Sequence, residues 1–148
     1  MAKFQYTYQK IVDLKSSEKT QAEWLLSSAI GKLQAEELSL EQLRQEQRQW
    51  MEKLHESSAK VVSLSEIRVL QLYLEYLEHT IASKLADVRR AQYEVENSRT
   101  HLTLKMKDEK VWQKSKDRAL ERYRSVMLIK EQNELDEMAT VRFVAPTS

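Results

Sequence analysis

The most constraining feature of this sequence is an apolar heptad pattern that runs without a break from Ile67 to Val126. Thirteen of its eighteen positions are apolar, at alternating spacings of three and four residues. A 3.5-residue repeat of this length predicts a supercoiled helix with a second helix lying along it. Such a helix offers length and surface rather than a pocket, so we expect contact rather than chemistry. The positions are Ile67, Leu70, Leu74, Leu77, Ile81, Lys84, Val88, Ala91, Val95, Ser98, Leu102, Lys105, Glu109, Trp112, Lys116, Ala119, Tyr123 and Val126.

The composition favours an all-α chain with few turns. Its 148 residues leave room for one domain, and they include only one glycine and one proline. Charged residues make up 32% of the chain, yet the net charge is only +1. Periodic Leu, Ile and Val among charges of both signs argue for long exposed helices rather than disorder. The predicted fold is all-α, a long antiparallel two-helix coiled-coil hairpin in which helix 2 is longer than helix 1.

The composition also disfavours several classes of function. The chain has no cysteine, which excludes a disulfide or a thiolate metal site. Glu75 and His79 are four residues apart, a spacing that we interpret as a surface contact rather than a metal site. Balanced charge gives no long-range attraction to nucleic acid, and neither a signal peptide nor a run of ~18 apolar residues is visible. We expect no catalytic, cofactor-binding or metal site and no nucleic-acid partner.

The limits of the helices follow from capping signals within a single hairpin spanning residues 1–148. Ser63 and Glu66 form a capping-box pattern, and Val62 and Ile67 occupy the hydrophobic-staple positions around it. These signals predict that helix 2 begins at residue 64. We expect helix 1 over about 7–57, a turn over about 58–63, helix 2 over about 64–138 and a flexible C-terminal tail over 139–148.

Helix 1 carries a seam of its own that changes register midway. A slip of one residue marks a local change of supercoil. Gly31 lies near the slip and costs about 1 kcal/mol relative to Ala in a helix, so a softer point is expected there. The seam begins as Phe4, Tyr8, Ile11, Lys15, Glu18, Ala22 and Leu25, and continues as Leu26, Ala29, Leu33, Glu36, Leu40, Leu43, Gln47, Trp50 and Leu54.

A short turn between long helices predicts an antiparallel pair whose contacting residues have numbers that sum to about 120. This pairing places Leu43 near Leu77, and it makes the seam polar where Lys15 and Glu18 face Lys105. Helix 2 should have no partner within the chain beyond about residue 116, although that stretch still carries apolar residues. An external partner or self-association of two such tails would cover this face, and both alternatives stay open.

Two regions stand out as candidate contact surfaces. Near the turn, Trp50, Tyr73 and Tyr76, with Leu72 off the seam, form an aromatic and apolar surface. Aromatic side chains are common at interaction hot spots, although these could simply cover the seam. The expected last turns of helix 2 crowd together acids that oppose the helix macrodipole. These carboxylates are expected to serve a partner, unless the helix continues past them. They are Glu131, Glu134, Asp136 and Glu137.

Three segments match a known family pattern. They are the opening residues 4–14, the residues 73–78 after the turn and, most specifically, residues 131–139 with the sequence EQNELDEMA. These segments resemble the FliJ family, the soluble coiled-coil component of the bacterial flagellar type III export apparatus. The family's C-terminal signature is usually an E-Q-K-x-x-D-E run, and Asn133 stands where the lysine is common. The resemblance spans nearly the whole chain, including its length and hairpin plan.

The resemblance implies a non-catalytic, stalk-like coiled coil of flagellar protein export. Such a stalk links the export ATPase, FliI in that family, to the membrane export-gate protein, FlhA, and it escorts export chaperones. It also implies a cytoplasmic protein that is peripheral to the cell membrane through its partners only. Two alternatives stay open: the equivalent stalk of a virulence type III secretion system, and a purely structural, self-associating coiled coil.

The same resemblance assigns residues to the two contacts by their positions in the family's motifs. The implied export-gate contact consists of Leu43, Trp50, Tyr73, Leu77 and Lys84. The implied ATPase contact consists of Tyr123, Gln132, Leu135, Asp136 and Glu137.

Overall fold

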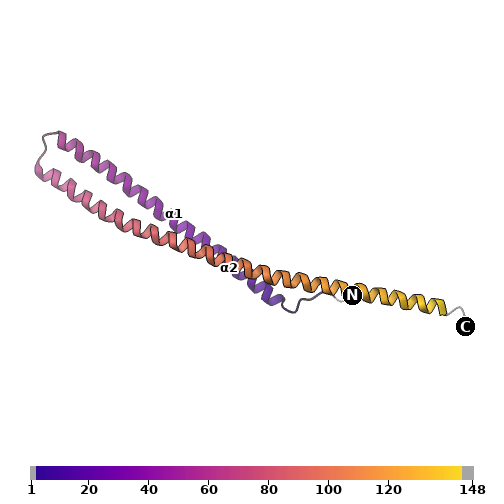
Figure 1. The fold of residues 1–148 in the computed structure, drawn as a ribbon. Helices are drawn as coiled ribbons and strands as arrows, with labels where there is room; N and C mark the ends of the chain where they lie inside the picture. Colours follow the sequence, from indigo (N-terminus) through magenta and orange to yellow (C-terminus); the bar gives the residue numbers. More distant parts are fainter. Residues whose placement is uncertain (1–2, 145–148) are drawn as a thin grey trace. The chain divides into compact units, whose positions relative to one another are not determined.

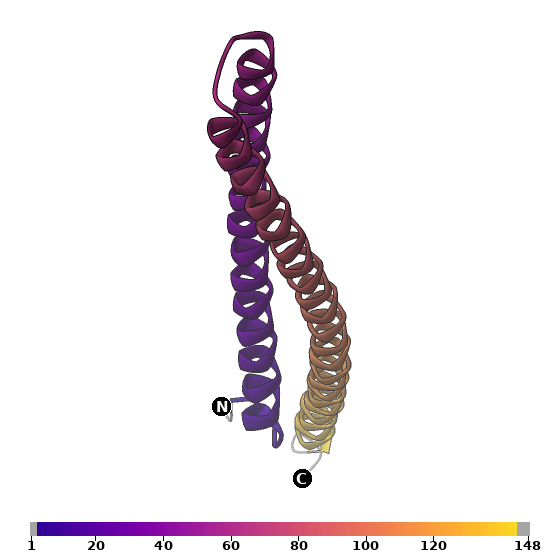
Figure 2. The ribbon, with the colours of Figure 1, turned by 90° about the vertical axis from the view of Figure 1, so that its left-hand side faces the viewer.

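The computed structural model describes residues 3–144 of the 148-residue chain. It contains two α-helices, α1 (Gln9–Ala59) and α2 (Leu64–Val144), and no strand within the described residues. The 51 residues of α1 and the 81 residues of α2 confirm the predicted all-α fold with a longer second helix. Figure 1 and Figure 2 show the chain reversing direction in the short connection between the two helices.

Local hydrogen bonds cap both helix ends on either side of the short connection. At the start of α2, the amide of Glu66 donates to the hydroxyl of Ser63 at 3.3 Å, and the amide of Ile67 donates to the Ser63 carbonyl at 3.3 Å. Ser63 is therefore the N-cap residue that the sequence predicts. At the end of α1, the amide of Lys60 donates to the Ser57 carbonyl at 3.3 Å, a tightened last turn that satisfies one helix-end carbonyl.

The contacts of the chain fall into two units, which are described separately. Unit 1 comprises residues 1–20 and 104–148, and unit 2 comprises residues 21–103. Within each unit, a segment of α1 packs antiparallel against a segment of α2.

Unit 2 is held together by a narrow seam of small and medium-sized apolar side chains. Two polar contacts give the register. In the seam, Lys84 Nζ lies 2.9 Å from Glu36 Oε2, and beside it the hydroxyl of Tyr73 donates to the carboxylate of Glu46. The residue numbers of these pairs sum to 120 and 119, so the predicted antiparallel pairing is confirmed. The buried apolar residues of the unit are Ala22, Ala29, Leu40, Leu77, Val88, Ala91 and Val95.

In unit 1, the residues that precede α1 extend the packing along α2. The ring of Phe4 lies 5.3 Å from the ring of Tyr123, and the hydroxyls of Tyr6 and Ser115 are 2.7 Å apart. The prediction that α2 has no partner beyond about residue 116 is therefore wrong. A segment outside a helix advances about 3.3 Å per residue rather than 1.5 Å, so a few residues cover more than two turns of α2.

The burial of side chains confirms the heptad pattern of α2. Of its eighteen positions only Val126 is exposed, at 62%. In α1 the predicted register slip between Leu25 and Leu26 is absent, because a continuous row of sheltered residues at alternating spacings of three and four runs from Val12 to Leu54. The seam passes from Ala22 to Leu26, and Leu25 is 57% exposed because it points away from that line. Tyr8 is 52% exposed, although its ring lies 6.1 Å from that of Trp112, whereas Val12, which the prediction omitted, is 2% exposed.

The C-terminal end of α2 lies further along the chain than the sequence suggested. The helix continues to Val144, where a flexible tail was expected from residue 139. Residues 139–144 contain no glycine or proline, and Pro146 is the first residue that disfavours helical backbone before it. The rest of the expected tail, 145–148, lies outside the described residues.

The seam of unit 2 can be tested with a pair of matched truncations on α2. Leu77 is 1% exposed, so Leu77→Ala leaves a cavity and should cost about 2–5 kcal/mol of unfolding free energy. Leu72 is 52% exposed, and Leu72→Ala should cost less than about 1 kcal/mol. Urea titrations followed by far-UV circular dichroism measure both values. Equal losses would show that the seam is assigned to the wrong face.

Candidate partner-binding surfaces

Two exposed surfaces carry the residues that the sequence singled out, one in each unit. Within residues 3–144, no group of three or more His, Asp or Glu side chains is placed to hold a metal ion. Over the same residues, neither helix contains a stretch long and apolar enough to cross a membrane.

The first surface, the turn aromatic cluster, consists of Trp50 and Lys53 from α1 with Tyr73 and Tyr76 from α2. The ring centroids of Trp50 and Tyr73 are 4.7 Å apart, and those of Tyr73 and Tyr76 are 6.0 Å apart. The ammonium of Lys53 lies 4.4 Å from the centroid of the Trp50 ring. Trp50 and Tyr73 are half-buried, whereas Tyr76 is 62% exposed. The cluster therefore both covers the seam and presents aromatic surface to solvent.

A hydrogen bond between the helices orients the middle ring of this cluster. The hydroxyl of Tyr73, from α2, donates to a carboxylate oxygen of Glu46, from α1. This hydrogen bond, together with desolvation and the charge of Glu46, raises the pKa of Tyr73 above its ordinary value of 10.0. The hydrogen bond therefore ties the ring of Tyr73 on α2 to α1.

The five residues implied for the export gate divide between surface and seam. Trp50 and Tyr73 belong to the turn aromatic cluster, and Leu43 is half-buried. Lys84 is engaged by Glu36 at 2.9 Å, a hydrogen bond that raises the pKa of Lys84 above its ordinary 10.5. Leu77 is 1% exposed, so it cannot touch a partner and instead supports the surface from beneath. Its assignment as a contact residue fails because a heptad seam position faces the other helix.

Two further apolar residues lie near the cluster: Leu72, which the sequence also indicates as off the seam, and Val69, which was not assigned from the sequence. Val69 is 64% exposed and Leu72 is 52% exposed. They lie seven and four residues before Tyr76, so they occupy the same helical face as that ring. The signal that could have found Val69 is its i, i+3, i+7 spacing with Leu72 and Tyr76 on the side of α2 away from the seam.

The second surface is the C-terminal segment, residues 128–142 of α2, in which every residue is exposed. Gln132, Leu135, Asp136 and Glu137 of the implied ATPase contact lie in it. Tyr123 does not, since its ring packs on Phe4 at 5.3 Å. The large apolar side chains of the segment are each between 59% and 66% exposed: Leu128, Ile129, Leu135, Met138 and Val141.

The acidic residues of this segment lie before the last turn of α2 and not within it. Asp136 and Glu137 were expected in the last turn, where they would oppose the macrodipole. Because α2 continues to Val144, they lie before the last turn, which carries Arg142 instead. The macrodipole acts mainly within the last turn. The acids are therefore tolerated without a special cost, and the exposed apolar residues are what mark this surface.

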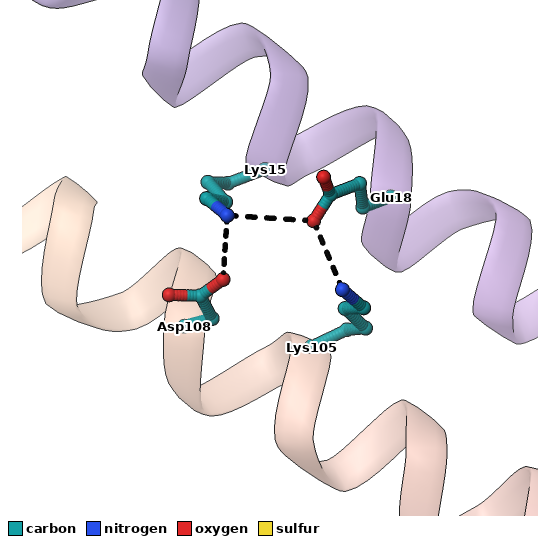
Figure 3. A network of polar contacts seen from close by, with 4 residues as sticks. All are labelled: Lys15, Glu18, Lys105 and Asp108. Carbon is teal, nitrogen blue, oxygen red and sulfur yellow. Dashed lines mark hydrogen bonds and ion pairs between the residues drawn. The ribbon is translucent and has the colours of Figure 1, made fainter.

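Unit 1 also contains an ionic seam between α1 and α2, drawn in Figure 3. Lys15 Nζ lies 2.9 Å from Asp108 Oδ2 and 3.6 Å from Glu18 Oε2, which in turn lies 3.2 Å from Lys105 Nζ. The hydrogen bond to Asp108 is the main cause that raises the pKa of Lys15 above 10.5. Polar seam positions select one register at a cost in stability. The predicted polar stretch of the seam is therefore present.

Lys19 and Glu109 form a neighbouring pair in the same unit. Their side chains meet at 3.0 Å through Oε1 of Glu109. The other carboxylate oxygen, Oε2, is buried and has no hydrogen-bond partner among the described residues. A half-satisfied buried carboxylate is a source of instability rather than of strength. This pair therefore contributes more to register than to stability.

Two long antiparallel helices that pack along a sheltered heptad seam define the class of coiled-coil hairpins. The family model described as flagellar FliJ protein matches residues 4–148, so the chain belongs to the FliJ family. Membership of this family makes the chain a component of a type III export apparatus. No curated protein sequence shows significant similarity to the chain.

Among solved structures, the chain is similar in fold to a putative YscO homolog from Chlamydia trachomatis. The TM-score is 0.70 at 18% sequence identity, and the alignment covers 98% of this chain and 98% of the other. Identity at this level supports the fold alone.

The interhelical hydrogen bond of Tyr73 predicts a dependence of stability on alkaline pH. A group whose pKa is raised on folding stabilises the folded chain below its unfolded pKa and loses that effect as pH rises through the folded value. For Tyr73 the loss begins above pH 10.0. We expect Tyr73→Phe to be less stable than the parent at pH 8 and to lose less stability between pH 8 and about pH 11.

Urea titrations at the two pH values test this expectation. Lys15 and Lys84 also have raised pKa values, so both proteins share a background loss at high pH. Tyr76→Phe is the control, because Tyr76 is 62% exposed on the same helix. An identical pH dependence in the parent and in Tyr73→Phe would contradict the assigned role of the hydrogen bond.

Proposed function

We propose that the chain is a non-catalytic, stalk-like component of the flagellar protein export apparatus. In this role it links the export ATPase to the membrane export gate and escorts export chaperones. It acts in the cytoplasm and is peripheral to the cell membrane only through these partners. Membership of the FliJ family supports the assignment to export, and the two separate exposed surfaces support a linking role.

The C-terminal segment is the proposed contact with the export ATPase. Its residues 128–142 are exposed throughout, including five large apolar side chains. Exposed apolar residues concentrated on one helical segment are typical of a helix that docks on another protein. Gln132, Leu135, Asp136 and Glu137 supply polar and apolar contacts together, as expected at an interface with a polar rim. Tyr123 acts indirectly, because its ring packs on Phe4 at 5.3 Å just before the segment begins.

The turn aromatic cluster is the proposed contact with the export gate. The Tyr73 hydrogen bond holds its rings in place, so little conformational entropy is lost when a partner binds them. Trp50 and Tyr76 present the aromatic surface, and Val69 and Leu72 extend it along α2. Leu43 and Lys84, which are half-buried, complete the proposed contact, and the buried Leu77 supports it by packing in the seam.

The flagellar assignment is preferred to the two alternatives. The matching family model is the flagellar one, whereas the likeness to the YscO homolog is one of fold at 18% identity. A purely structural coiled coil gives no reason for an ordered aromatic cluster that stays exposed. The virulence stalk therefore remains the second candidate, and binding to purified ATPases of both systems distinguishes the two.

The ATPase contact is tested by a chain that ends at Met127. This truncation removes the exposed segment and keeps the contacts of Phe4 and Tyr6 with α2, so unit 1 should still fold. We expect it to lose binding to the purified export ATPase, measured by biolayer interferometry. Full binding by the truncated chain would place the ATPase contact elsewhere.

Matched point variants separate the role of the segment from that of its length. Leu135 is 65% exposed in the segment, and Leu104 is 59% exposed elsewhere on α2. Leu135→Lys should weaken ATPase binding at least about tenfold, as for a central apolar anchor. Leu104→Lys should leave binding unchanged, and an equal effect of the two variants would contradict the assignment.

The gate contact is tested with two tyrosines of similar exposure on α2. Tyr76 is 62% exposed in the turn aromatic cluster, and Tyr93 is 68% exposed outside it. Tyr76→Ala should weaken binding to the purified cytoplasmic domain of the export gate at least about tenfold while ATPase binding is kept. Tyr93→Ala should bind the gate like the parent. Unchanged gate binding by Tyr76→Ala would remove the cluster from the proposal.

A further inference from the structure

In unit 2, α1 carries a second heptad row on the side away from α2. All nine of its residues are exposed, and successive members are three or four residues apart. The buried seam of α1 in this unit runs through Ala22, Ala29 and Leu40, about half a helical turn from the row. The row, called the uncharged row below, consists of Gln21, Trp24, Ser28, Gly31, Ala35, Leu38, Gln42, Gln45 and Gln49.

The absence of charge from this row is unexpected for a solvent-facing helix surface. Charged residues make up 32% of the chain, so nine positions would carry about three charges, and these carry none. The outer face of an amphipathic helix is normally the charged one. Depletion of charged residues is, by contrast, a feature of the buried centre of protein interfaces.

The centre of the row holds residues that the hairpin itself does not explain. Trp24 is 72% exposed and Leu38 is 61% exposed. Gly31 lies midway between them in a helix interior, where glycine costs about 1 kcal/mol relative to alanine. A Cβ atom added at Gly31 would meet no atom within 4 Å, and its φ is not positive. Nothing within the chain therefore requires glycine at this position.

We propose that the uncharged row is the interface of an antiparallel homodimer, in which the α1 helices of two copies pack about a two-fold axis through Gly31. Trp24 and Leu38 lie seven residues before and after Gly31. A two-fold axis there places Trp24 of each copy against Leu38 of the other, because an isologous interface pairs each residue reciprocally. Gly31 permits the two backbones to approach closely at the axis.

A second copy of the chain fits this surface for reasons of charge and shape. A row without charge excludes a charged partner surface, since unpaired charges would lose their hydration on docking. The row of a second copy is equally free of charge. The small side chains of Ser28 and Ala35 flank the axis and leave room for the indole of Trp24. Six of the nine residues are not apolar, so the dimer should be weak, with a dissociation constant of about 1–100 µM.

Sedimentation equilibrium of the full chain over about 1–300 µM brackets that dissociation constant. We expect a reversible monomer–dimer equilibrium. Trp24→Lys should raise the dissociation constant at least about tenfold, as expected for a central aromatic anchor. Tyr93→Lys is the matched control, because Tyr93 is 68% exposed on the other helix, and it should dimerise like the parent. Far-UV circular dichroism verifies that both variants keep the parent's helicity.

Disulfide trapping tests the register, because the natural chain has no cysteine. Gly31→Cys should form a disulfide-linked dimer under mild oxidation. Trp24→Cys alone should not, whereas a mixture of Trp24→Cys and Leu38→Cys should cross-link, since a disulfide needs Cα atoms about 4.4–6.8 Å apart. Three outcomes would overturn the proposal: a monomer at every concentration, a dimer that Trp24→Lys does not weaken, and efficient self-linking of Trp24→Cys, which indicates a parallel pair.

Discussion

The close approach of α1 and α2 along small side chains is the interaction on which the rest of the structure depends. In unit 2 this seam includes three alanines, Ala22, Ala29 and Ala91, together with Leu77 and Val88. Burial contributes about 25 cal/mol per Å² of apolar surface, so small side chains contribute little each and stability accumulates along the length of the pair. A seam this narrow shelters only one face of each helix. Over the described residues the other faces are largely open to solvent, which leaves room for the contacts proposed above.

Unit 1 uses charge where unit 2 uses apolar packing. Lys15, Glu18, Lys105 and Asp108 form a linked set whose side chains are between 22% and 38% exposed. Partly exposed ion pairs are weakened by salt and contribute modestly to stability, but mismatched registers would bring like charges together. The contact of Phe4 with Tyr123 adds apolar packing at the same end. The α1–α2 contact of this unit is thus specified more by pairing than by burial, and its local opening should cost less than that of unit 2.

The sequence predicts the parts of the fold that follow from periodicity and capping. The heptad of α2, the Ser63 cap and the sum of about 120 in unit 2 all follow from residues close in sequence or evenly spaced. The contact between Phe4 and Tyr123 could not be predicted, because it is made by a segment outside a helix whose path has no periodic signal. Family motifs indicate positions but not exposure, which explains why Leu77 was assigned to a surface although it lies in the seam. Apolar periodicity does not predict the uncharged row, because the row is marked by missing charge rather than by a repeat of apolar residues.

The turn aromatic cluster and the C-terminal segment differ in how their order is maintained, and this bears on how each would bind the partner proposed for it. The turn aromatic cluster is fixed by contacts between two helices, including the hydrogen bond of Tyr73 to Glu46. The C-terminal segment has no sheltered residue over 128–142, so its helix is supported by propensity alone. Extension of a helix already packed in unit 1 avoids the cost of nucleation, which is the main barrier for an isolated helix of this length. The residues of the segment are mostly good helix formers, such as Leu135, Glu137 and Met138. A partner that binds this segment must therefore offset the entropy cost of ordering its frayed end. A partner that binds at the turn meets a surface that is already ordered.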